Sequence, residues 1–134
     1  MRVGIALGVC LMACMGGTET EVIVTTDASC SSISNAIVSL DGSQTVLFCS
    51  GAGDFGSAVY HPTSSTQTDV VVVATTDKSD PATCLASPGS ACIIARRKAP
   101  VSYQTNVPVV LEQGCAGLVC DPTTTCMNGS CTSF

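Results

Sequence analysis

The chain has 134 residues, which is enough for one domain with short appendages. Apolar residues make up 46% of it and Trp is absent, so any core must be built mainly from Val, Ile, Leu and Ala, a composition that favours strands. The formal net charge is −5 with only five Lys and Arg, which argues against nucleic acid as a partner because phosphate binding needs clustered cations.

Residues 1–13 have the features of an export signal. Arg2 supplies a positive charge, and an apolar stretch of about eleven residues follows it. A helix needs about 20 apolar residues to span a bilayer core, so this stretch is too short for a permanent anchor. The ten cysteines agree with export, since disulfides persist in oxidising compartments and thiols in reducing ones.

The segment Leu11-Met12-Ala13-Cys14 resembles the lipobox of bacterial lipoproteins, with an aliphatic residue three before the cysteine and a small one directly before it. The resemblance implies that residues 1–13 are removed and that Cys14 carries a lipid whose fatty acids are of the palmitate type. Cys10 fits worse, because Val9 before it is bulkier than the pattern allows. Met15, rather than Asp, follows Cys14, which by the same resemblance implies sorting to the outer membrane. The alternatives are an ordinary secretory signal cut elsewhere, or a buried first strand.

Residues 14–20 show no periodicity and are interpreted as a lipidated tether. Residues 21–113 consist of short apolar runs separated by turn residues such as Asp41-Gly42 and Gly51-Ala52-Gly53. The expected strands are residues 21–26, 36–40, 45–49, 58–60, 69–75, 91–96 and 107–111. Seven short strands across about 90 residues predict an all-β fold, an antiparallel β-sandwich of immunoglobulin-like size.

The patterns within three runs predict where their side chains lie. Residues 69–75 are apolar on both faces, which indicates a central strand. Alternation directs Ala36, Val38 and Leu40 to the core and Ser39 and Asp41 outward. The basic run 96–98 is interpreted as a solvated strand end, and the alternative is a contact with anionic lipid or polysaccharide.

Residues 114–134 form a Cys-rich tail that is too small for a core of its own and must be stapled by disulfides. The two ends of the mature chain, residues 20–27 and 110–131, resemble lipoproteins of myxobacteria that have such a C-terminal tail and no established activity. The tail also resembles half of an epidermal-growth-factor-type module. These resemblances imply location and fold but leave function open.

Apart from Cys10 and Cys14, eight cysteines remain, an even number that fits four disulfides. Locality favours Cys30 with Cys49, Cys84 with Cys92, and an interlaced tail with Cys115 bound to Cys126 and Cys120 to Cys131. The connectivity of the tail is the least constrained of these. The alternative to the two tail disulfides is a zinc site made by the same four cysteines. Their spacing contains no C-x-x-C pair, so we expect no metal.

Other candidate residues give no catalytic motif. His61 is the only histidine, and nothing links it to a nucleophile such as Ser57 or Ser64, so it is interpreted as an exposed loop residue. Three aspartates, Asp54, Asp77 and Asp80, lack the spacing of a calcium loop and are interpreted as turn formers. Asn128-Gly129-Ser130 matches a glycosylation sequon but is interpreted as a turn. We therefore expect neither an enzyme nor a cofactor.

The sequence thus favours a membrane-anchored surface lipoprotein of the cell envelope. Its loops and its stapled tail would bind a protein or a polysaccharide of the envelope, or play a structural part there. The alternative is an inhibitor of an extracellular protease, in which the disulfide-held loop 121–125 enters the protease cleft.

Overall fold

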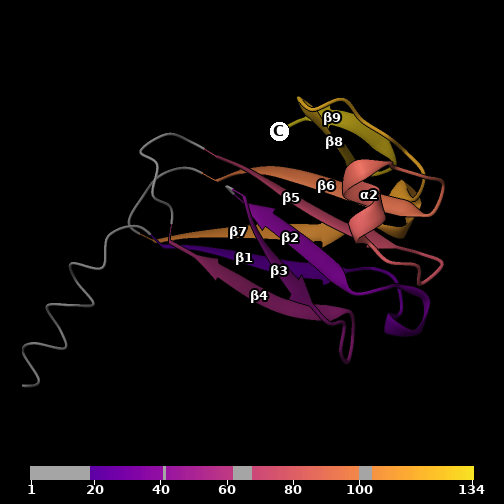
Figure 1. Ribbon diagram of the computed structural model, residues 1–134, viewed down its shortest axis with the longest axis horizontal. Coiled ribbons are helices and arrows are strands. Elements are labelled where there is room, and N and C mark those ends of the chain that lie inside the picture. Colours follow the sequence, from indigo (N-terminus) through magenta and orange to yellow (C-terminus); the bar gives the residue numbers. More distant parts are fainter. Residues whose placement is uncertain (1–18, 41, 62–67, 100–103) are drawn as a thin grey trace, which may run out of the picture.

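The computed structural model describes residues 19–40, 42–61, 68–99 and 104–134, and these form two stacked β-sheets with a small hairpin at one end (Figure 1). All seven expected strands are present, so the predicted all-β fold is confirmed. They are β1 (Glu19–Thr26), β2 (Ala36–Leu40), β3 (Ser43–Leu47), β4 (Asp54–Tyr60), β5 (Thr68–Thr75), β6 (Cys92–Ala99) and β7 (Gln104–Leu111). The signal and the lipobox with Cys14 lie outside the described residues.

The strands divide into a three-stranded sheet in the order β4-β1-β7 and a four-stranded sheet in the order β3-β2-β5-β6. Neighbours run antiparallel except β1 and β7, which pair in parallel from Glu19 opposite Gln104 to Thr26 opposite Leu111. The sequence predicts a wholly antiparallel sandwich, and this one parallel pair corrects that prediction. Because β7 starts at the same end of the sandwich as β1, it adds to the edge of β1 in the same direction.

The core lies between the two sheets. Val22 and Val24 of β1 meet Val38 of β2 and Val72 of β5 there, and all four are fully buried. The Tyr60 hydroxyl also crosses between the sheets and donates a hydrogen bond to the Val38 carbonyl oxygen at 2.9 Å. Hydrophobic burial on this scale is what holds two such sheets face to face.

The predicted orientation of β2 is confirmed within the described residues, since Ala36, Val38 and Leu40 are in the core and Ser39 is half-buried. Asp41, expected to point outward, lies outside the described residues. Gly53, in the second expected turn, has a φ of 85°, and a Cβ there would collide with the Thr26 carbonyl oxygen. The turn therefore requires glycine at this position.

The outer face of the four-stranded sheet is covered as well. The short helix α2 (Ala82–Ala86), which the sequence did not predict, places Cys84 over Val73 of β5 and Ile94 of β6. β5 therefore has buried side chains on both faces and lies between β2 and β6, which confirms its predicted central position. No helix in the described ranges is long and apolar enough to cross a bilayer.

The two ends of the sandwich differ. At the entry end β1 begins with Glu19, so residues 19 and 20 belong to the sheet and not to the tether expected over residues 14–20, and Thr20 is fully buried. At the opposite end, here called the distal end, β1, β3, β5 and β7 finish (Figure 1). The distal end also carries η1 (Cys30–Ser32), α2 and η2 (Gln113–Cys115). The strands β8 (Thr124–Met127) and β9 (Ser130–Ser133) lie along β6, with their turn near the end of β7.

Candidate binding surface at the distal end

Four disulfides fasten the distal end. Cys92, Cys126 and Cys131 lie in strands β6, β8 and β9, and the other five cysteines lie in short helices or loops. The pairs are Cys30–Cys49, Cys84–Cys92, Cys115–Cys126 and Cys120–Cys131, which is the pairing that locality in the sequence favours. Because all four tail thiols are used in disulfides, the tail has no thiolates for the zinc site considered as an alternative.

The tail packs onto the sandwich as part of its core. Cys115, Cys120 and Cys126 are buried in the main cluster, and Thr125 is fully buried. Strands β8 and β9 form an antiparallel hairpin whose turn is Asn128-Gly129, both with positive φ, as the sequence predicted for this dipeptide.

The basic run 96–98 was expected to be a solvated strand end, and that expectation is wrong for Arg96. Its backbone N–H donates to Thr125 Oγ1 at 2.8 Å. Its guanidinium donates to the carbonyl oxygens of Cys120, Asp121 and Thr124 at 3.4, 3.4 and 3.1 Å. Arg96 thus ties the tail loop to the edge of β6, a contact between residues 24 to 29 positions apart in sequence.

The other two cations of the run also contact the tail. Arg97 donates to Thr125 Oγ1 at 3.5 Å, and burial lowers the pKa of its guanidinium. Lys98 forms an exposed ion pair with Asp69 at 3.1 Å and lies 5.0 Å from the ring centroid of Phe134. Arg97 and Lys98 therefore also contact the C-terminal segment, and Lys98 stays exposed.

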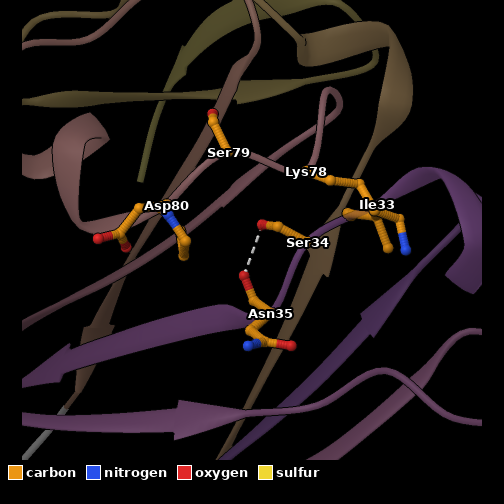
Figure 2. A pocket seen from close by; sticks show the side chains of 7 residues that line it. Ile33, Ser34, Asn35, Lys78, Ser79 and Asp80 are labelled. Carbon is orange, nitrogen blue, oxygen red and sulfur yellow. Dashed lines mark hydrogen bonds between the residues drawn. The ribbon is translucent and has the colours of Figure 1, made fainter.

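A shallow hollow of about 360 Å³ opens at the distal end between two segments, residues 33–35 before β2 and residues 78–81 after β5. Figure 2 shows the ammonium end of Lys78 and the carboxylate of Asp80 on opposite sides of this hollow, with Ser34 between them and Asn35 below. Ile33 and Pro81 add apolar surface to the lining.

The walls of the hollow are fixed by hydrogen bonds. Ser34 Oγ accepts the Thr75 N–H at 2.8 Å and donates to the Asn35 carbonyl oxygen at 2.7 Å. Lys78 Nζ donates to the Cys30 carbonyl oxygen at 3.4 Å, and one oxygen of Asp80 accepts the Ala82 N–H at 3.0 Å. The Asn35 side-chain amide makes no hydrogen bond to any described residue, so its donors and acceptor face solvent.

An exposed aromatic side chain, Phe48, follows the edge strand β3. The β2–β3 register pairs Ala36 with Leu47, and one further step along it sets Phe48 opposite Asn35. The alternation of exposed and half-buried side chains in β3 continues through Phe48, which is 66% exposed, and Val46 on the same face is 50% exposed. Phe48 is not among the residues that line the hollow, and β3 lies on the opposite side of β2 from β5, which leads to residues 78–81.

The sequence did not single out Asn35, Phe48 or Lys78. Only Phe48 left a signal, as an aromatic residue in register with the outward positions of an edge strand. The pairing of Asn35 with Lys78 depends on contacts between segments about forty residues apart, which local patterns do not encode.

The residues that the sequence did single out lie apart from this hollow, except for Asp80. His61 and Ser57 are exposed at or just after β4, as expected for His61, and Ser64 lies outside the described residues. Nothing in the described ranges gathers three His, Cys, Asp or Glu side chains that could hold a metal ion.

The three aspartates form turns, as predicted. Asp54 Oδ1 accepts the Gly56 N–H at 2.8 Å, and Asp80 Oδ1 accepts the Ala82 N–H at 3.0 Å in the turn before α2. The side-chain hydrogen bond from Ser79 and then the backbone one lower the pKa of Asp77.

No known protein family matches the chain, and neither a curated protein nor a solved structure is detectably similar to it.

Proposed function

We propose that the chain is a lipid-anchored protein of the bacterial cell envelope, held on the outer membrane through Cys14, and that it acts there as a non-enzymatic binding or structural module. The lipobox-like segment Leu11-Met12-Ala13-Cys14 supports the anchor. The observation that carries the proposal is that the two ends of the sandwich differ. β1 begins at Glu19, close behind Cys14, while the first two disulfides, the start of the tail and the hollow are at the other end.

This difference between the two ends suits a module that is tethered at one end and makes contacts at the other. Loops at the distal end are cross-linked, so binding there would order few side chains and lose little conformational entropy. The exposed groups of this end are turns and short helices, which are the segments that usually carry recognition on a β-sandwich.

The tail loop supports this proposal over a protease inhibitor. Thr124 donates its N–H to the Asp121 carbonyl oxygen at 3.0 Å, so residues 121–124 form a β-turn. The carbonyl groups of Asp121 and Thr124 are directed at Arg96. A protease cleft pairs with extended main chain, which this loop does not offer.

The anchor is tested by following a clickable fatty acid in cells that produce the full chain. We expect the wild type to take up the label and to sediment with membranes, and Cys14→Ser to lose both properties. Cys10→Ser is the matched control and should keep them, because Cys10 precedes the expected cleavage site. Labelling that persists in Cys14→Ser, or a wild type that is soluble and unlabelled, would refute the proposed anchor.

A further inference from the structure

We propose that the edge strand β3 pairs antiparallel with β3 of a second copy of this chain, so that the four-stranded sheets of the two copies join into one. β3 pairs with β2 on one side, and no described strand pairs with its other side. The backbone N–H and C=O groups that face away from β2 are therefore a template for a further strand. This pairing does not depend on the lipid anchor.

The other three sheet edges carry features that oppose such pairing. At β6 the tail covers the edge, where the Arg96 N–H donates to Thr125 Oγ1. β7 contains Pro108, which has no N–H to donate. In β4 the register with β1 shifts so that Phe55 has no partner, which makes a β-bulge. Each of these features blunts an edge against the addition of a strand.

β3 has none of these features. Its register with β2 is regular throughout, and it contains neither a proline nor a charged residue. The uncharged stretch runs over residues 42–53, in a chain with ten acidic residues and a net charge of −5. Along it the side chains of Val46 and Phe48 are 50% and 66% exposed. A regular, uncharged edge with exposed apolar side chains favours association.

Charge and symmetry favour a second copy as the occupant. Two acidic copies repel each other where their carboxylates approach, and the uncharged stretch at β3 removes that repulsion from the contact. An antiparallel strand pair related by a two-fold axis is self-complementary, since the donors of each copy meet the acceptors of the other. We infer the register that sets Val46 opposite its counterpart, because it buries Val46 and brings Phe48 of the other copy beside it on the same face.

Antiparallel pairing fixes how the two copies are oriented. β3 of each copy runs toward its own distal end, so the entry ends of the two copies point in opposite directions. If Cys14 carries the lipid, the two lipids lie at opposite ends of the pair, which suits a contact between membranes that face each other. This consequence alone rests on the proposed function.

The test measures sedimentation equilibrium of the full chain in a polyoxyethylene detergent of neutral buoyancy, with micelles in large excess over protein. We expect a monomer–dimer equilibrium with a dissociation constant in the micromolar range, because a strand of five residues buries little area. Val46→Lys and Val46→Glu should each weaken dimerisation about tenfold, since like charges then face each other. An equimolar mixture of the two variants should restore it, because opposite charges then pair.

Val110→Lys is the matched control. Val110 is a strand residue that is 40% exposed, and β7 lies beside β6 at the other edge of the sandwich, so this variant should dimerise like the wild type. A wild type that stays monomeric throughout the micromolar range overturns the proposal. So does an equal loss of dimer in Val46→Lys and Val110→Lys, or a mixture of the two Val46 variants that dimerises no better than either alone.

Discussion

At the scale of single residues, Arg96 determines how the tail is held. Its guanidinium donates to three carbonyl groups of the tail, and its own backbone N–H is satisfied by the buried Thr125. A guanidinium suits this task because it presents several N–H donors in a fixed plane.

We predict that Arg96→Ala loosens the tail. Loss of charge-assisted hydrogen bonds to carbonyl groups costs about 1.5 to 3 kcal/mol, so amide hydrogens of residues 116–131 should exchange faster while those of β1 and β5 do not. Lys98→Ala is the control from the same run, because its ion pair is exposed and contributes less than about 1 kcal/mol. Equal effects of the two substitutions, measured by hydrogen exchange, would contradict the account.

Tyr60 also contributes to stability as a single residue, because its hydroxyl joins the two sheets through hydrogen bonds to Val38 and Thr45. Burial raises the pKa of Tyr60 above the ordinary tyrosine value, and the hydrogen bond with Thr45 offsets part of this. A pKa that is raised in the folded state gives stability that is present below about pH 10 and is lost as pH rises through the folded value.

We therefore predict that Tyr60→Phe costs about 1 kcal/mol at neutral pH, and that the cost shrinks in alkaline solution. The chain has two tyrosines, so an absorbance titration of tyrosinate should lose its later step in Tyr60→Phe. Disappearance of the earlier step instead would show that the Tyr60 hydroxyl is not buried between the sheets.

At the scale of elements, the two tail disulfides allow a controlled comparison. Both span 11 residues, so each restricts the unfolded chain to a similar degree, by about 3 kcal/mol. Cys115 and Cys126 are both buried, whereas Cys131 is exposed.

Replacing Cys115 and Cys126 with Ala should therefore cost about 1 kcal/mol more than replacing Cys120 and Cys131, because a cavity is added to the lost cross-link. Urea unfolding without reductant measures the difference, with mass spectrometry to check that the other three bridges are intact. A larger cost for the pair with the exposed Cys131 would mean that the tail is not packed as described.

Local patterns predicted the elements that depend on local chemistry. Short apolar runs between turn residues predicted the seven strands, and Asn128-Gly129-Ser130 predicted a turn, which the structure forms between β8 and β9. The five residues of α2 are too few to show a 3.6-residue stripe, and the parallel pairing of β7 with β1 joins segments about 85 residues apart. The role of Arg96 and the meeting of Asn35 with Lys78 were missed for the same reason, because they are set by tertiary packing.

At the scale of the whole molecule, the sandwich has two unlike ends. Its core is continuous through both sheets, but the first two disulfides, the start of the tail and the hollow are at the distal end, and the tail hairpin lies along β6. If Cys14 carries the lipid, the stabilised end is the one presented away from the membrane, where it would meet ligands and proteases. Disulfides there restrict local opening, which is the step that proteases exploit.

The intact mass of the protein extracted from membranes, taken with and without reduction before alkylation, tests this account most directly. We predict the mass of residues 14–134 plus acyl chains, with eight cysteines alkylated only after reduction. A mass without acyl chains, or cysteines alkylated before reduction, would contradict the account of a lipid-anchored module with a disulfide-stapled distal end.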